Sequence, residues 1–285
     1  MSDQTWRNAI NNNPIHHSIR QFLNQFPLKT YRSLLRPREL DCPRLYIWGR
    51  STKNSFDQEC VKWQVFLKFS KCDFDTEISN EPLMSPSGKL PFLVLTTGEN
   101  LVDDGIEKFI SDRYSEQFVS LSNEQQADSQ AYIALADTKL RNALLARPEL
   151  VDSMFEWVTI LRIIFIFATI SHKFYVSHYS KPLDKILFHQ YKNLAIKELL
   201  TRKQALNGEE IYQEAAEALQ SISVAFGDND YFFGRLPTFI DAVIFSYIHV
   251  MLAIQTKELI SLVQKHSNLI EFSKRINNDY CLLEF

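Results

Sequence analysis

One stretch, Ser85–Leu95, constrains the fold of this 285-residue chain more than any other. It begins as a turn, since Pro86 fixes its own φ angle and Gly88 can adopt a positive φ. The hydroxyl groups of Ser85 and Ser87 can bond nearby backbone amides, as they commonly do in turns. We therefore predict a tight turn that leads directly into the apolar residues behind it.

A short strand follows the turn, and it contains a proline. Lys89 ends the turn, the apolar run begins at Leu90, and Pro91 is its second residue. A proline removes a ladder hydrogen bond, so a strand tolerates it only where the backbone turns. We predict a cis peptide bond between Leu90 and Pro91, which X-Pro bonds adopt at low cost. Taken alone, the motif also fits an ordinary turn ahead of a buried strand.

Alternating apolar residues predict a small sheet around this strand, with further strands at 44–49, 74–78 and 100–102 and the proline strand at 92–95. Ser55 and Gln58 have the spacing of a capping box, so we expect Ser55 to cap a first helix. Asp103 is expected to cap a second helix. The order β-α-β and then β-β-α is that of the thioredoxin-like fold.

The second half of the chain has helical periodicity. The polar segment 120–129 is predicted to be a linker, because strand signals end before it. The helices that we expect after it lie near residues 130–145, 148–172, 183–206, 209–226, 238–255 and 257–277.

The helix near 238–255 has a helix start that physical chemistry explains. Thr238 can cap the helix, and Asp241, three residues later, can accept a hydrogen bond from the Thr238 amide. The Asp241 charge also complements the positive end of the helix dipole. Since the residues that follow are almost all apolar, we expect this helix start to be buried.

Two strings together resemble the metaxin family. They are Ser-Pro-Ser-Gly-Lys-Leu-Pro-Phe at 85–92 and Phe-Gly-Arg-Leu-Pro-Thr-Phe-Ile-Asp-Ala at 233–242. The pair Asp57-x-x-Cys60 adds to this similarity. The resemblance implies a glutathione-transferase-like fold of class α+β/α, in which a thioredoxin-like domain precedes an all-α domain. The domains expected are an N-terminal extension at 1–43, the thioredoxin-like domain at 44–119 and the all-helical domain at 120–285.

Composition and charge exclude several functions. The formal net charge is −3, so no overall basic field exists to attract nucleic acid, and we expect no nucleic-acid partner. The four cysteines have no C-x-x-C pair or metal-ligand spacing, so we predict free thiols. We also expect no metal and no cofactor. These cysteines are Cys42, Cys60, Cys72 and Cys281.

Glutathione chemistry is the enzymatic alternative, and the sequence argues against it. In the transferases that the fold resembles, a Tyr, Ser or Cys near the first helix holds a thiolate, and a Glu/Gln-Ser pair holds the γ-glutamyl group. Here the pair is Val102-Asp103, in which valine offers no hydrogen bond and Asp103 repels a carboxylate. Ser55 is expected to act as a cap, and Cys60 lies too far into the helix to gain fully from the dipole. We therefore predict no catalytic residues.

The most apolar window, Trp157–Ile170, has fourteen residues and contains Arg162, whereas a membrane span needs about 20. A buried core helix is the favoured interpretation. The alternative is a surface that contacts a partner or a membrane, for which Trp157, Arg162 and Phe165 are the candidate residues. The last residues of the sequence show no membrane segment, which points to a peripheral metaxin-like protein.

The resemblance implies a function as well as a fold. Peripheral metaxin-like proteins are subunits of the mitochondrial sorting and assembly machinery, which inserts β-barrel proteins into the outer membrane. The implied partners are the β-barrel insertase subunit, a second metaxin-like subunit and the β-barrel precursors, on the cytosolic face of that membrane. A glutathione-dependent transferase or reductase, or a soluble adaptor, is the alternative.

Overall fold

The computed structural model describes residues 40–49, 55–79, 81–118, 120–145, 197–198, 208–253 and 256–280. All of the described residues belong to one compact unit. Several predictions fall outside the described residues: nearly all of the extension at 1–43, the helix at 148–172 and most of that at 183–206. The boundary predicted between the two domains stays a prediction.

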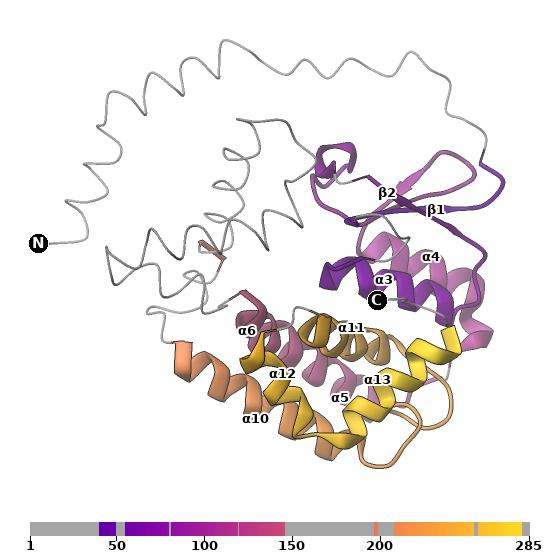
Figure 1. Ribbon diagram of the computed structural model, residues 1–285. Helices are drawn as coiled ribbons and strands as arrows, with labels where there is room; N and C mark the ends of the chain where they lie inside the picture. The colour runs from indigo at the N-terminus through magenta and orange to yellow at the C-terminus, as the bar shows by residue number, and fades with distance from the viewer. Residues whose placement is uncertain are drawn as a thin grey trace, which may run out of the picture. The chain divides into compact units, whose positions relative to one another are not determined.

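The four predicted strands are confirmed and form one sheet in the order β2-β1-β3-β4 (Figure 1). β1 pairs in parallel with β2 and antiparallel with β3, and β3 pairs antiparallel with β4. This mixed sheet is the one expected for a thioredoxin-like domain. The strands are β1 Arg44–Ile47, β2 Asp75–Ile78, β3 Phe92–Val94 and β4 Asn100–Leu101.

Two helices belong to this domain: α3, Gln58–Phe69, and α4, Asp104–Tyr114. Between β2 and β3 the structure has a short 3₁₀ turn, Pro82–Met84. Both helices bury apolar side chains in the same core as the sheet. Removal of these apolar side chains from water is the main source of stability, at about 25 cal/mol for each Å² of apolar surface buried.

The helical half begins earlier than the sequence predicts. The segment 120–129 is not a linker, because Ser122 and Gln125 form a complete capping box and start α5, Asn123–Leu135. The short polar side chains that favour a linker are the ones that cap a helix. A π-helical stretch, Ala136–Leu140, leads into α6, Arg141–Leu145.

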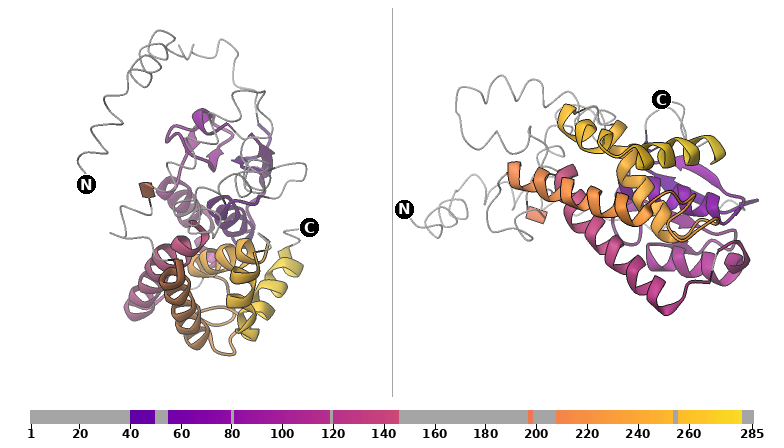
Figure 2. Two further views of the ribbon diagram at one scale, coloured as in Figure 1. Left: turned by 60° about the vertical axis from the view of Figure 1, so that its left-hand side comes forward. Right: turned by 90° about the horizontal axis from the view of Figure 1, so that it is seen from below.

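The remaining described helices form the rest of this half, and Figure 2 shows them from two further sides. The single helix predicted at 257–277 is instead two helices, which separate at Lys265 and His266. At this break Lys265 keeps right-handed helical backbone angles, and the His266 N–H donates to the Val263 carbonyl. The helices are α10 Gly208–Phe226, α11 Phe239–Ala253, α12 Lys257–Gln264 and α13 Ser267–Tyr280.

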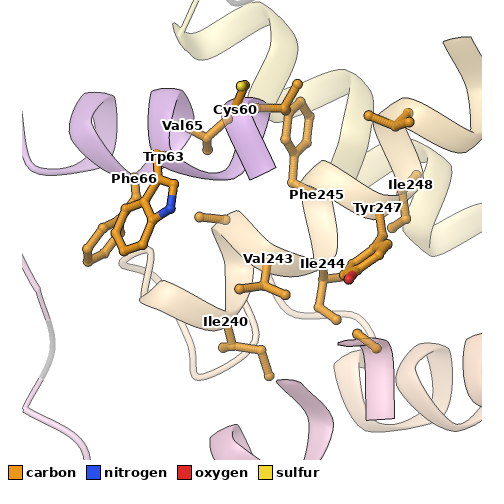
Figure 3. Close-up of a cluster of buried hydrophobic side chains, with 14 of the residues drawn as sticks. Cys60, Trp63, Val65, Phe66, Ile240, Val243, Ile244, Phe245, Tyr247 and Ile248 are labelled. Carbon is orange, nitrogen blue, oxygen red and sulfur yellow. The ribbon is translucent and has the colours of Figure 1, made fainter. Parts of the chain in front are cut away.

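Helix α11 forms the centre of the fold. All of its residues from Ile240 to Met251 are buried, and it packs directly on α3. Figure 3 shows the apolar side chains between the two helices, among them Cys60 and Trp63 of α3 and Phe245 of α11. The thioredoxin-like and helical halves therefore share one hydrophobic core. Within the described residues, no helix combines the length and apolar character needed to span a membrane.

Candidate functional site

The turn at Ser85–Lys89 has the predicted construction. The Ser87 N–H donates to Ser85 Oγ at 3.3 Å, the two hydroxyl oxygens are 3.0 Å apart, and the Gly88 N–H donates to the Ser85 carbonyl. Gly88 has a φ of 68°, and Ser85 is buried, whereas Pro86, Ser87, Gly88 and Lys89 are exposed. The Leu90–Pro91 bond is cis, as predicted. This surface turn thus leads directly into the buried strand β3.

At the start of α3 the capping residue is Asp57. The prediction that Ser55 caps this helix is therefore wrong. The Asp57 carboxylate accepts a hydrogen bond from the Cys60 N–H at 3.2 Å. Ser55 Oγ instead accepts from the Asp57 N–H at 3.1 Å and so holds the capping residue itself. Desolvation and then the neighbouring Glu59 charge raise the pKa of Asp57. The chain's own carboxyl group therefore satisfies a donor at this helix end.

Cys60 is fully buried, as predicted for a structural cysteine. Its sulfur accepts a hydrogen bond from the Trp48 N–H at 3.4 Å. Burial and the Asp57 charge raise the pKa of the thiol well above its usual value. Since the thiolate is the nucleophilic form, this cysteine is not activated for nucleophilic chemistry. Cys42, Cys60 and Cys72 are free thiols, which confirms the prediction for the cysteines that the structure describes.

Val102 and Asp103 lie between β4 and α4, the position at which the resemblance to transferases implies a γ-glutamyl site. Asp103 occupies the capping position, but its side chain makes no cap hydrogen bond, so the predicted cap is wrong. The reason is conformational: Asp103 has a φ of 39°, outside the extended geometry that a capping residue adopts. Its carboxylate is exposed and remains a like charge for an anionic ligand.

At the start of α11 one buried carboxylate accepts three hydrogen bonds. Asp241 is fully buried, and its carboxylate accepts hydrogen bonds from the Thr238 N–H, the Thr238 hydroxyl and the Phe232 N–H at 2.7–2.8 Å. The bond from the Thr238 amide was predicted, whereas the Phe232 bond was not. Burial raises the pKa of Asp241 to about 6, although the hydrogen bonds lower it. The Asp241 carboxylate thus ties the Phe232 loop to α11.

Sequence reasoning missed the polar links between the two halves. Gln58 Nε2 of α3 donates to Ser246 Oγ of α11 at 2.9 Å, and both residues are buried. Arg141 contacts Glu59 of α3 at 3.4 Å and Glu198 at 2.7 Å. These partners lie 57 to 188 residues apart, and no local pattern marks them.

The predicted site residues form separate groups. Among the described residues, no hydrogen bond joins the Ser85–Pro91 motif to the Thr238–Asp241 motif. No group of His, Cys, Asp and Glu side chains in the described ranges could hold a metal ion. The candidate contact residues Trp157, Arg162 and Phe165 lie outside the described residues.

Comparison with known proteins defines the class first. The family model of the glutathione S-transferase N-terminal domain matches residues 58–150, and that of the C-terminal domain matches residues 215–276. The crystal structure of the glutathione transferase GSTFuA3 from Phanerochaete chrysosporium superposes with a TM-score of 0.57 at 15% identity, covering 86% of this chain and all of that one. The chain therefore has the glutathione-transferase fold.

Sequence relatives then define the family. Metaxin-2 from Homo sapiens is 28% identical over 228 residues, which cover 76% of this chain and 80% of the relative. Metaxin-1 from Mus musculus is 27% identical over 250 residues, which cover 82% and 72%. The chain belongs to the metaxin family, as the two strings in its sequence indicate.

Proposed function

We propose that this chain is a non-enzymatic, peripheral subunit of the machinery that inserts β-barrel proteins into the mitochondrial outer membrane. In this role it receives β-barrel precursors on the cytosolic face and binds the insertase subunit and a second metaxin-like subunit. Membership in the metaxin family is the observation that carries the proposal. The fold alone carries no function, because it hosts both enzymes and binding proteins.

The start of α3 supports the non-enzymatic part of the proposal. Asp57 caps the helix with a carboxylate, and Cys60 is a buried thiol with a raised pKa. A glutathione thiolate that approached this helix end would meet the Asp57 carboxyl group instead of an activating hydroxyl. At the start of α4, Val102 and Asp103 supply neither the neutral hydrogen-bond donor nor the charge that a γ-glutamyl carboxylate needs.

A glutathione-dependent transferase or reductase is the second candidate, because both transferase family models match the chain. The two candidates differ in what the folded protein must bind. A transferase binds glutathione without any partner protein, whereas the proposed subunit binds membrane proteins and no small thiol.

Purification of the tagged chain from mitochondria in mild detergent tests the proposal. We expect the β-barrel insertase subunit and a second metaxin-like protein to co-purify with it. The chain should be extracted by alkaline carbonate and digested by protease added to intact organelles. A protein found wholly in the cytosol, or normal assembly of outer-membrane barrels in a strain that lacks it, would contradict the proposal.

The candidate contact residues can be tested in the same experiment. Combined Trp157→Ala and Phe165→Ala substitutions should reduce co-purification of the partners if this apolar window contacts them. The melting temperature of the variant separates this effect from a loss of folding, which is expected if the window is a core helix.

A further inference from the structure

The outer edge of β2 presents unpaired backbone groups. On its inner side, the Asp75 N–H donates to the Pro43 carbonyl at 2.9 Å, and the Ser79 N–H donates to the Ile47 carbonyl at 3.2 Å. Peptide groups alternate in direction along a strand, so those of Thr76 and Ile78 point away from β1. In the part of the chain that the structure describes, the N–H groups of these two residues make no hydrogen bond.

The two faces of β2 differ: one carries the acidic side chains, and the other carries the half-buried Thr76 and Ile78. Asp75 and Glu77 pair with Arg44 and Tyr46 and share their face of the sheet. Their side chains are 49% and 48% exposed, and the exposed Asp73 precedes them at the same spacing. One cation, Arg44, lies 3.6 Å from Asp75 and 3.0 Å from Glu77. The Asp75 and Glu77 carboxylates therefore share one guanidinium group, and the exposed Asp73 adds a further negative charge to the same face.

The opposite face of β2 has a different character. Thr76 and Ile78 pair with Leu45 and Ile47, and both of these β1 residues are fully buried. A strand added at this edge would therefore place its alternate side chains beside carboxylates and beside a half-buried apolar surface. Directly opposite side chains lie about 5 Å apart, which is close enough for opposite charges to pair.

The charge of β2 also determines which strand can bind. Two copies of this chain that paired through β2 would bring Asp75 and Glu77 of one copy against those of the other, which is unfavourable. The other edge strand, β4, has two residues, Asn100 and Leu101, and offers a shorter edge. The occupant that fits β2 is an extended segment with cationic side chains.

We propose that the outer edge of β2 binds an extended client segment as a fifth strand, with Lys or Arg at alternate positions and apolar residues between them. The backbone groups of Thr76 and Ile78 pair with the segment, and Asp75 and Glu77 select its charge. This inference rests on the proposed function, in which the clients are β-barrel precursors, because strands of such barrels alternate apolar and polar residues.

A fluorescent peptide of about ten residues in which Lys alternates with Val tests this proposal by anisotropy. The matched peptide has the same residues without alternation. We expect the alternating peptide to bind more tightly, and we expect Asp75→Lys with Glu77→Lys to weaken its binding about tenfold. The control variant, Glu116→Lys with Asp128→Lys, changes the same number of exposed charges on other elements and should bind as the wild type does.

Thr76→Pro tests the backbone part of the proposal. Proline removes an N–H group that points away from β1, so the strand can keep its ladder, and an unchanged melting temperature verifies this. Binding of the alternating peptide should weaken about tenfold. Equal binding by Thr76→Pro and the wild type, or equal binding of the two peptides, would overturn the proposal.

The same variant separates this inference from the function on which it rests. If the chain is a subunit of the insertion machinery but β2 binds no client, Thr76→Pro will co-purify with the partners and leave barrel assembly unchanged. If the proposed function is wrong, the wild-type chain itself will not co-purify with them. If both are right, Thr76→Pro will co-purify with the partners and slow barrel assembly.

Discussion

Asp241 and Asp103 both lie at the start of a helix, and their surroundings are opposite. Asp241 is fully buried and accepts three hydrogen bonds that hold α11 to the loop before it. Asp103 is exposed, has a φ of 39° and makes no cap bond at the start of α4. The helix start that stabilises the core is intact, whereas the one that faces a ligand in transferases lacks the groups for binding.

This difference separates the part of the fold that holds the core from the helix start that binds a ligand in transferases. The α3–α11 packing and the Asp241 bonds hold together the one core that the two halves share. The helix starts that bind the ligand in transferases are present as α3 and α4. In this chain they carry Asp57, Val102 and Asp103 in place of groups that bind an anionic thiol. The fold therefore keeps its shared core, while two of its helix starts, at Asp57 and Asp103, differ from those of the transferases.

Asp241→Ala should produce the largest effect. It leaves the buried Thr238 and Phe232 N–H groups without an acceptor, which should lower the free energy of unfolding by about 3 kcal/mol. Chemical denaturation of both proteins measures the difference. The matched variant is Asp103→Ala, which should change stability by less than about 0.5 kcal/mol. Equal effects of the two substitutions would contradict the comparison.

The pH dependence of stability should identify Asp241 as a buried carboxyl. Burial raises its pKa in the folded protein to about 6, from the usual value of 3.8 for an aspartate. The folded state therefore binds the proton more tightly, and stability falls as pH rises from about 4 to 6, by about 2 kcal/mol. Asp241→Asn should remove this component. If the stability of the wild type relative to Asp241→Asn rises over this range, the assigned direction is wrong.

Ser246→Ala should break the polar link between the two halves. It leaves Gln58 Nε2 buried without its acceptor, at a cost of about 1.5 kcal/mol. Ser261→Ala is a matched control, because Ser261 also bonds a carbonyl three residues earlier but is exposed. A thermal denaturation series should show a loss for Ser246→Ala alone. Equal losses would mean that the Gln58 bond contributes nothing.

Asp103→Gly should give the smallest change, in the opposite direction. Glycine adopts a φ of 39° without steric cost, and the aspartate side chain makes no cap bond that would be lost. We expect stability to rise by up to about 1 kcal/mol, measured by the denaturant midpoint. A clear loss of stability would show that the Asp103 side chain supports α4.

Local patterns in the sequence predict much of this structure. The four strands, the cis proline and the bond from the Thr238 amide to Asp241 all follow from neighbouring residues. The sequence favours Ser55 as the cap of α3, whereas the structure has Asp57 there. Serine and aspartate both cap helices, and these two residues lie only two positions apart. Local preference cannot distinguish them when tertiary packing sets the first turn.

The remaining features depend on contacts between distant parts of the chain. No spacing in the sequence indicates that Gln58 meets Ser246 or that Phe232 donates to Asp241. The polar run at 120–129 illustrates a different difficulty, because its short side chains suit a linker and a capped helix equally well. The residues predicted to contact a partner stay a prediction.

Titration of the folded chain with glutathione in a calorimeter tests most directly whether this fold has lost its ligand. Because Asp57 lies at the start of α3 and the Val102-Asp103 pair precedes α4, we expect no saturable heat at glutathione concentrations up to about 10 mM. The standard free energy of binding would then be weaker than about −3 kcal/mol. A transferase of the same fold serves as the positive control. Saturable binding with a Kd of about 1 mM or lower would contradict the account and favour the enzyme.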